Sequence, residues 1–210
     1  MRRIIPTIFA TNKKEFNERF FKLIKILREI QIDFMDGKFV KTKGIRPSAL
    51  PSLKNYSNKF EAHLMVKNPQ KYISLLKKKG FKKVIFHFES LDKEKIPQLI
   101  EKIKQNKMQA WIAINPQTHT KKIIDFLPNL NGILLMGVSP GKEGQKFQPN
   151  VLEKAIQLRK LTKLPIQLDG GVTPLNIRKI FKSKIDIVNS GGFVANAENP
   201  KSALEILMKA

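Results

Sequence analysis

Short apolar runs alternate with longer, lysine-rich amphipathic segments along the whole chain. The apolar runs contain many β-branched residues and have the length of buried strands. They predict eight strands, at 4–9, 30–34, 60–66, 84–88, 110–114, 132–136, 165–169 and 185–189. The amphipathic segments predict helices at 13–28, 47–55, 69–79, 93–106, 120–127, 149–161, 174–182 and 200–209. A strand and a helix repeated eight times indicate an α/β protein, a compact (β/α)8 barrel.

The main alternative fold is an open, doubly wound sheet. No dinucleotide-binding glycine fingerprint supports it. A chain of 210 residues is long enough for one good core, and no linker, low-complexity block or repeat interrupts the pattern. We therefore expect residues 1–210 to form a single TIM barrel domain.

The composition narrows the cellular setting. The chain contains no cysteine, which excludes disulfides and thiolate metal sites, and no apolar run is long enough for a membrane span. The apolar stretch near the N-terminus is too short for a signal peptide. We expect a cytoplasmic protein without a membrane partner.

The formal charge of +23 and the pI of about 10.2 raise nucleic acid as a partner. Only seven of the 40 cationic residues are arginine, and the lysines are spread over every predicted helix. Lysine lacks the fork with which arginine binds phosphate in a bidentate manner. A nucleic-acid partner is therefore disfavoured, although the basic field would steer anionic substrates towards the protein.

Two carboxylates lie at the ends of apolar runs. Asp33 belongs to the second run and Asp169 to the seventh. In an eight-stranded barrel these two strands lie far across from each other, and catalytic side chains collect at the carboxyl ends of the strands. Carboxylates facing a substrate from opposite sides suit inversion at a carbon atom. Asp33 and Asp169 are therefore the candidate acid and base.

Other chemical side chains fall at the same predicted barrel mouth. Gln31 and Asp33 are two residues apart, so both point to one side of their strand. His63 lies in the third run, and we expect it to converge with Gln31, Asp33 and Asp169. Further candidates at strand ends are His87, Glu89 and Asn115. Met35, Met65 and Met136 recur at three strand ends, as core filling or as apolar cover for a reacting centre.

Glycine-rich loops follow the last three predicted strands. They contain the pairs Gly141 and Gly144, Gly170 and Gly171, and Gly191 and Gly192. Backbone without side chains lets N–H groups approach phosphate oxygens, and barrels often bind phosphate after strands seven and eight. These loops predict a phosphate site, so the substrate should carry a phosphate at one end.

Seven segments of the chain resemble the motifs of a known family. The segments DFMDGKFV, AHLMV, FHFES, INPQT, LLMGVSPGKEGQKF, LDGGV and NSGGFVANAENP look like the successive motifs of ribulose-phosphate 3-epimerases, in the same order. The resemblance implies a TIM barrel of the ribulose-phosphate-binding type. It also implies interconversion of D-ribulose 5-phosphate and D-xylulose 5-phosphate, in a phosphorylated-ketose-binding protein expected to be a homo-oligomer.

The resemblance also implies roles for individual residues. Asp33 and Asp169 match the proton acceptor and donor of the family. A divalent metal cation, Zn²⁺, Fe²⁺ or Mn²⁺, would be held by residues that match Gln31, Asp33, His63 and Asp169. His63 also matches a substrate contact, as does Thr7 in place of a serine. The six glycines named above fall in phosphate-contacting loops.

Several positions depart from the family, among them Gly192 in place of a serine and Lys38 in place of a histidine or asparagine. Gln31 stands where the family has a histidine ligand, and a neutral oxygen suits zinc less than imidazole does, so we expect a weakened or absent metal. Lys142 and Glu143 replace an aromatic residue and a glycine; Glu143 would repel a phosphate unless its side chain turns away. The alternatives are an epimerase for another ketose phosphate, such as allulose 6-phosphate, or a non-catalytic sugar-phosphate-binding protein.

Overall fold

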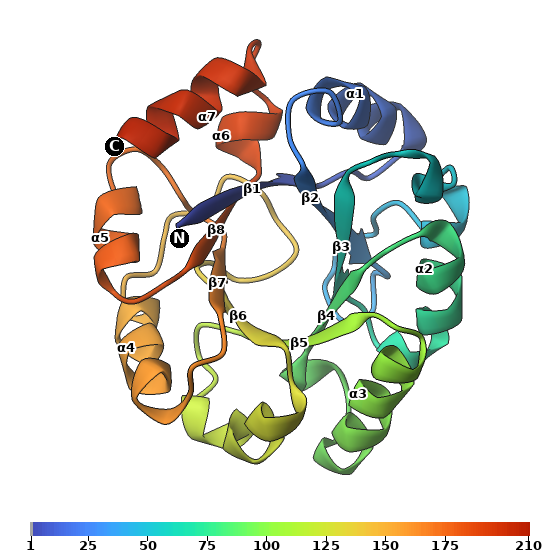
Figure 1. Cartoon of the computed structure of the whole chain (residues 1–210), viewed down its shortest axis with the longest axis vertical. Helices are drawn as coiled ribbons and strands as arrows, with labels where there is room; N and C mark the ends of the chain where they lie inside the picture. The colour runs from blue at the N-terminus through green and yellow to red at the C-terminus, as the bar shows by residue number, and fades with distance from the viewer. Residues whose placement is uncertain (1) are drawn as a thin grey trace.

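A closed barrel of eight parallel strands forms the centre of the computed structural model, which describes residues 2–210 (Figure 1). The strands are β1 (Arg3–Ile8), β2 (Glu29–Met35), β3 (Lys59–Met65), β4 (Lys83–His87), β5 (Gln109–Ile114), β6 (Gly132–Met136), β7 (Ile166–Asp169) and β8 (Ile187–Ser190). Each pairs with the next along the chain, and β8 pairs with β1. The predicted (β/α)8 barrel is confirmed, and each predicted strand matches to within two residues at its ends.

Helices surround the barrel on its outside (Figure 1). They are α1 (Lys13–Leu23), α2 (Ile73–Lys79), α3 (Ile96–Gln105), α4 (Val151–Leu161), α5 (Ile177–Lys182), α6 (Gly192–Ala195) and α7 (Pro200–Lys209). Their buried faces pack on the outward side chains of the strands and form the larger hydrophobic core. Among the described residues, no helix combines the length and the apolar character needed to cross a membrane.

Two predicted helices are instead 3-10 segments. The predicted helix at 47–55 consists of two short turns, Pro47–Ala49 and Leu53–Asn55. Pro51 explains the break, because a proline disfavours helical backbone in the residue before it. Leu50 is accordingly extended, with φ −75° and ψ 149°. The predicted helix at 120–127 is a 3-10 segment as well, Thr120–Asn129, and contains Pro128.

Other helix ends also differ from the prediction. The first helix ends at Leu23 and not near residue 28, because the carbonyls of Ile24 and Leu27 accept hydrogen bonds from the Asn58 side chain instead of continuing the helix. The helix predicted from residue 174 begins at Ile177, after a turn closed by the Asn176 side chain. The four-residue helix α6 after β8 was not predicted.

The interior of the barrel is divided into an apolar and a polar part. The apolar part contains Trp111 and its neighbours from β1, β4, β5, β6 and β8. Gly132 makes room for the Trp111 indole, since a Cβ at this position would lie 2.5 Å from the ring. The polar part is built by inward side chains of β1, β2, β3, β7 and β8, with Lys83 from β4 beside them, all buried. This division places hydrogen-bonding groups beneath one half of the barrel mouth.

Candidate active site

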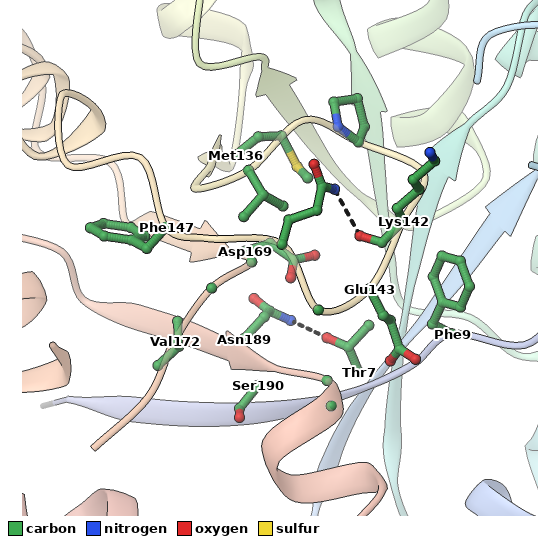
Figure 2. Close-up of a pocket in the computed structure, with 18 of the residues that line it drawn as sticks. Thr7, Phe9, Met136, Lys142, Glu143, Phe147, Asp169, Val172, Asn189 and Ser190 are labelled. Atoms are coloured by element: carbon green, nitrogen blue, oxygen red, sulfur yellow. Dashed lines mark hydrogen bonds between the residues drawn. The ribbon is translucent and has the colours of Figure 1, made fainter. Parts of the chain in front are cut away.

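A cavity of about 670 Å³ opens at the carboxyl ends of the strands (Figure 2). Most of the residues predicted from the sequence line it: Thr7, Asp33, His63, Met65, Met136, Gly141, Gly144, Asp169, Gly170, Gly171, Gly191 and Gly192. Gln31 lies deeper and is completely buried. Met35 is buried and lines a smaller cavity of about 350 Å³, between the segments that follow β2 and β3. The cavity thus gathers residues from across the sequence at one mouth.

Asp33, His63 and Asp169 form a compact cluster in this cavity. Strand register places Asp33 directly beside His63, because the two residues are paired in β2 and β3. His63 Nδ1 lies 3.0 Å from Asp33 Oδ1 and 3.4 Å from Asp169 Oδ2. One potential ligand atom from each residue lies within 4.8 Å of the others. Two carboxylates and one imidazole therefore meet at a single point.

Gln31 lies against this cluster through its nitrogen. Its Nε2 donates to Asp169 Oδ2 at 2.6 Å and to Asp33 Oδ1 at 3.1 Å. Its Oε1 faces away from the cluster and accepts from Gln167 Nε2 at 3.3 Å. A side-chain NH₂ has no lone pair to offer a metal. Gln31 as a fourth metal ligand stays a prediction that requires its carboxamide to turn over.

Burial and hydrogen bonding shift the protonation of the cluster in a specific way. Burial raises the pKa of Asp33 to about 6, against the lowering effect of His63. Burial alone would lower the pKa of His63, but hydrogen bonds to Asp169 and Asp33 outweigh it and raise that pKa to about 9. At neutral pH His63 therefore holds a proton that a cation would have to displace.

His63 is in turn held by His87. The two rings are stacked, with centroids 5.1 Å apart, and their Nε2 atoms are 2.9 Å apart. Burial lowers the pKa of His87, so His87 is the neutral partner. Glu89 lies beyond it, with Oε2 3.5 Å from His87 Nδ1. This chain of contacts fixes the orientation of the His63 ring from the side opposite Asp33.

The glycine loops after β6, β7 and β8 line the cavity (Figure 2). Gly171 has a left-handed φ of +71°, and a Cβ there would lie 2.8 Å from the Phe147 backbone. Ser190, at the end of β8, is buried, and its Oγ has no hydrogen-bond partner within residues 2–210. A buried hydroxyl without a partner is unfavourable unless a ligand or water satisfies it.

The Glu143 carboxylate at the cavity edge is neutralised by Arg19 of α1. Two parallel contacts join them, Nη1 to Oε1 at 3.1 Å and Nη2 to Oε2 at 3.0 Å. The same loop is tied to the loop after β2, where Thr42 Oγ1 donates to Gly141 O at 2.6 Å. The Glu143 carboxylate is thus paired with a cation, while its Oε1 lies close to Gly191 of the loop after β8.

Several polar residues that adjoin the cluster were not predicted from the sequence. Asn189 lies in β8 beside Asp169 in register and donates to Thr7 Oγ1 at 3.1 Å. Glu61 and Gln167 each lie two residues before a cluster member, as Gln31 does. That repeated spacing was the available signal, because residues two apart on a strand share a face.

The Asp33, His63 and Asp169 cluster could bind a metal ion. Carboxylate oxygen and imidazole nitrogen are donors that zinc, iron and manganese accept, and three protein ligands leave a position free for another ligand. The ring of His63 is oriented by His87, as metal-binding histidines usually are by a second group. The donor set therefore fits a divalent cation.

Comparison with known proteins places these features in a family. Residues 3–195 match the sequence model of the ribulose-phosphate 3 epimerase family. A ribulose-phosphate 3-epimerase of Schizosaccharomyces pombe is 28% identical over 208 residues, covering 96% of this chain and 90% of that protein. One of Helicobacter pylori strain J99 is 31% identical over 183 residues, covering 84% of this chain and 83% of that protein.

Solved structures show the same fold at low sequence identity. A 3-hexulose-6-phosphate synthase from Salmonella typhimurium superposes with a TM-score of 0.75 at 14% identity, covering 99% of this chain and 97% of that chain. A tryptophan synthase chain of Mycobacterium tuberculosis gives a TM-score of 0.74 at 12% identity, covering 99% and 91%. These likenesses concern the barrel fold alone.

Proposed function

Because the chain belongs to the ribulose-phosphate 3-epimerase family, we propose that it interconverts D-ribulose 5-phosphate and D-xylulose 5-phosphate by proton transfer at C3. The observation that carries the proposal is the pair of carboxylates, Asp33 and Asp169, in the same cavity as three glycine loops. The carboxylates supply acid and base, and the loops supply a place for phosphate. Both ends of a ketose phosphate therefore have a partner.

The proposed reaction uses the two aspartates on opposite faces of the substrate. C3 lies next to the C2 carbonyl, so one carboxylate removes the C3 proton and leaves an enediolate. The other carboxylate, which must start protonated, returns a proton to the opposite face and inverts C3. Burial raises the pKa of Asp33 to about 6, so this carboxyl takes up a proton more readily than an exposed aspartate does.

Asp33, His63 and Asp169 would hold a divalent cation, of which zinc, iron and manganese remain candidates. When bound, the cation would neutralise negative charge that develops on the substrate oxygens. We propose that this metal binds more weakly than it would to a site with a fourth good ligand, because Gln31 directs its NH₂ at the carboxylates. The two hydrogen bonds from Gln31 compete with the cation for the same oxygens.

The phosphate of the substrate is proposed to lie against the loops after β6, β7 and β8. Ser190 Oγ supports this position, since its buried hydroxyl needs a partner. Thr7 and His63 line the same cavity and are proposed substrate contacts, and Met65 and Met136 supply apolar cover. Met35 keeps its proposed role only if substrate reaches past the β2 end, because it lines the neighbouring cavity.

The expected cytoplasmic location, the homo-oligomeric state and the absence of a nucleic-acid partner stay predictions. The exposed apolar side chains at the cavity rim, Leu175 and Phe193, are compatible with a partner copy. Sedimentation would settle the oligomeric state, and a salt titration of DNA retention would address nucleic acid.

The test of the proposed function is a direct assay on defined substrates. Purified protein is supplied with Zn²⁺, Fe²⁺ or Mn²⁺ and incubated with D-ribulose 5-phosphate or with allulose 6-phosphate, and the C3 epimer is measured by NMR. Turnover of the pentose phosphate at a higher kcat/KM supports the proposal. Preference for the hexose phosphate would instead support the alternative, an epimerase for allulose 6-phosphate. Binding of both without turnover would make it a sugar-phosphate-binding protein.

A further inference from the structure

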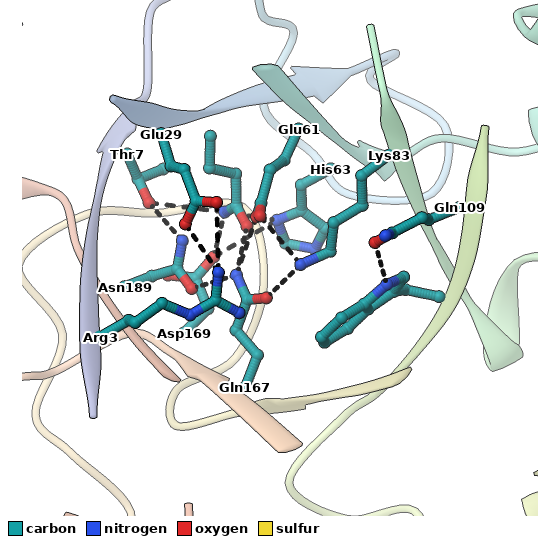
Figure 3. Close-up of polar contacts among 12 residues, drawn as sticks. Arg3, Thr7, Glu29, Glu61, His63, Lys83, Gln109, Gln167, Asp169 and Asn189 are labelled. Atoms are coloured by element: carbon teal, nitrogen blue, oxygen red, sulfur yellow. Dashed lines mark hydrogen bonds and ion pairs between the residues drawn. The ribbon is translucent and has the colours of Figure 1, made fainter. Parts of the chain in front are cut away.

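A ladder of buried polar side chains lies inside the barrel, beneath the carboxylate cluster (Figure 3). It starts at Lys83 of β4, whose Nζ lies 3.0 Å from Glu61 Oε1 and also donates to Gln167 Oε1. The Gln167 amide nitrogen then faces three acceptor oxygens, Asn189 Oδ1 at 2.5 Å, Glu61 Oε2 at 3.1 Å and Gln31 Oε1 at 3.3 Å. The last step runs from Gln31 Nε2 to Asp33 and Asp169. The proposed reaction uses only the top of this ladder.

The chemistry of Lys83 fixes the direction of every step. An ammonium group has three donors and no acceptor, so the Gln167 side chain must turn its oxygen towards Lys83. The Gln167 nitrogen then faces Gln31, and the Gln31 oxygen faces Gln167 while the Gln31 nitrogen donates to Asp169 and Asp33. The opposite orientation of Gln31 would set two NH₂ groups against each other in a buried site, which costs unmade hydrogen bonds.

The Lys83 ammonium is well placed to impose this direction. It is held by the Glu61 carboxylate and lies 3.3 Å from the centroid of the Trp111 ring, so it is fixed on two sides. Glu61 and Lys83 are both buried, and so are the two glutamines. The amides of Gln31 and Gln167 therefore cannot reverse as surface side chains do. Reversal would require the pair of Lys83 and Glu61 to change.

We propose that Lys83 is a positioning residue that acts through Gln167 to hold the Gln31 oxygen away from the Asp33, His63 and Asp169 cluster, and so limits that cluster to three metal ligands. The inference rests on the metal centre in the proposed function. It makes the affinity for the cation depend on a buried charge that touches none of the three ligands and lines no part of the active-site cavity.

A charge-conserving exchange reverses the ladder. In the double variant Glu61→Gln with Gln167→Glu, the carboxylate moves from β3 to β7 while the net charge stays the same. The carboxylate introduced at position 167 would be an acceptor only, so Gln31 would have to donate to it and turn its own oxygen up to the cluster. Asn189 Oδ1 now accepts from Gln167, so the Asn189 amide would have to turn as well, and it can do so because the Thr7 hydroxyl both donates and accepts. The Gln31 oxygen would then be available as a fourth ligand.

In the experiment, Co²⁺ is titrated into metal-free protein. Binding is measured by calorimetry and by the visible absorption of the bound ion. The exchange variant should bind Co²⁺ about tenfold more tightly than the unmodified chain. Its absorption spectrum should also change, because the Gln31 oxygen would join the ligands of the ion. The same exchange made in a Gln31→Leu background should leave the affinity unchanged, because no carboxamide remains to turn.

Three results would overturn the proposal. One is an unchanged Co²⁺ affinity in an exchange variant whose circular dichroism and melting temperature are normal. Another is an equal gain in the Gln31→Leu background, and the third is no Co²⁺ binding by any of the proteins. If the exchange variant does not fold, Lys83→Met with Glu61→Gln removes the charged pair, frees Gln167 to turn and should also tighten binding. Failure here leaves the epimerase assay unaffected, and an inactive enzyme leaves the titration readable.

Discussion

Arg19 and Glu143, which are 124 residues apart, form a forked ion pair that joins helix α1 to the loop after β6 at the edge of the active-site cavity. Both side chains are partly buried, with 18% and 26% of their surfaces exposed. The pair explains how a glutamate can lie among loops proposed to bind phosphate. The Arg19 guanidinium balances the charge of the Glu143 carboxylate, so the electrostatic potential at the proposed phosphate position is not set by Glu143 alone.

The first prediction concerns this pair. Arg19→Met frees the Glu143 charge beside the proposed phosphate position, and the KM for the sugar phosphate should rise about fivefold, as for a loss of about 1 kcal/mol in a part-exposed pair. The kcat should change little. Lys22→Met, which removes one exposed charge from the same helix, is the matched control and should leave KM unchanged.

The double variant Arg19→Met with Glu143→Gln removes both charges. It should return KM to within about twofold of the original, because the repelling carboxylate is gone as well. A KM that rises equally in the single and the double variant would show that Arg19 acts by some route other than the neutralisation of Glu143.

The second prediction tests the glycine loops. In Gly191→Val the new Cβ would lie 3.3 Å from Glu143 Oε1 and 3.8 Å from Thr7 Cβ, so the side chain would occupy the proposed phosphate position. KM should rise at least about tenfold, since one hydrogen bond to a charged group contributes about 1.5–3 kcal/mol. The melting temperature should stay close to that of the unmodified chain, because Gly191 has a negative φ of −77°. Undiminished affinity for inorganic phosphate would remove this loop from the phosphate site.

The third prediction concerns Gln31 itself. Gln31→His replaces an NH₂ that opposes the cation with an imidazole that can ligate it, on the same face of β2 as Asp33. Divalent metal should bind at least about tenfold more tightly, and turnover at limiting metal should rise. Metal titration with a parallel epimerase assay measures both quantities. Equal affinity and equal activity in the two proteins would remove position 31 from the metal site.

Much of the fold and part of the site can be predicted from the sequence. The eight strands are recognisable because strands buried on both faces are continuous apolar runs. The positions of Asp33 and Asp169 follow because functional groups in such barrels gather at strand ends. The convergence of Asp33 with His63 needs only the pairing of neighbouring strands, which consecutive β/α units impose.

The rest depends on contacts between residues far apart in the chain. The direction of the Gln31 amide is set by Lys83 through Gln167, and Gln31 and Gln167 are 136 residues apart. No local pattern fixes which end of a carboxamide faces a carboxylate. The 3-10 segments at 47–55 have a local cause, since Pro51 interrupts the predicted helix there.

The fourth prediction is a release of protons on metal binding. Both raised pKa values, about 9 for His63 and about 6 for Asp33, mean that protons bound at lower pH must leave before the cation can bind. At pH 7 His63 should lose about one proton, and at pH 5 Asp33 should contribute a second. Metal affinity should therefore increase from pH 5 towards pH 9.

Calorimetry in two buffers with different ionisation enthalpies counts these protons directly. His119, which lies outside the cluster, gives a control variant, His119→Gln, that should release the same number. No proton release at pH 7 would mean that His63 is neutral in the metal-free protein, contrary to its contacts with two carboxylates.

The central claim is that Asp33 and Asp169 each serve one face of C3. The most direct test measures deuterium incorporation at C3 in D₂O, starting from D-ribulose 5-phosphate or from D-xylulose 5-phosphate. The unmodified chain should place deuterium at C3 of the product from either substrate. Asp33→Asn and Asp169→Asn should each lose interconversion by about 10²–10⁴-fold. Each should still exchange the C3 proton of one epimer, a different one for each variant. Near-normal interconversion by Asp169→Asn, or loss of exchange from the same epimer in both variants, would contradict the two-base account.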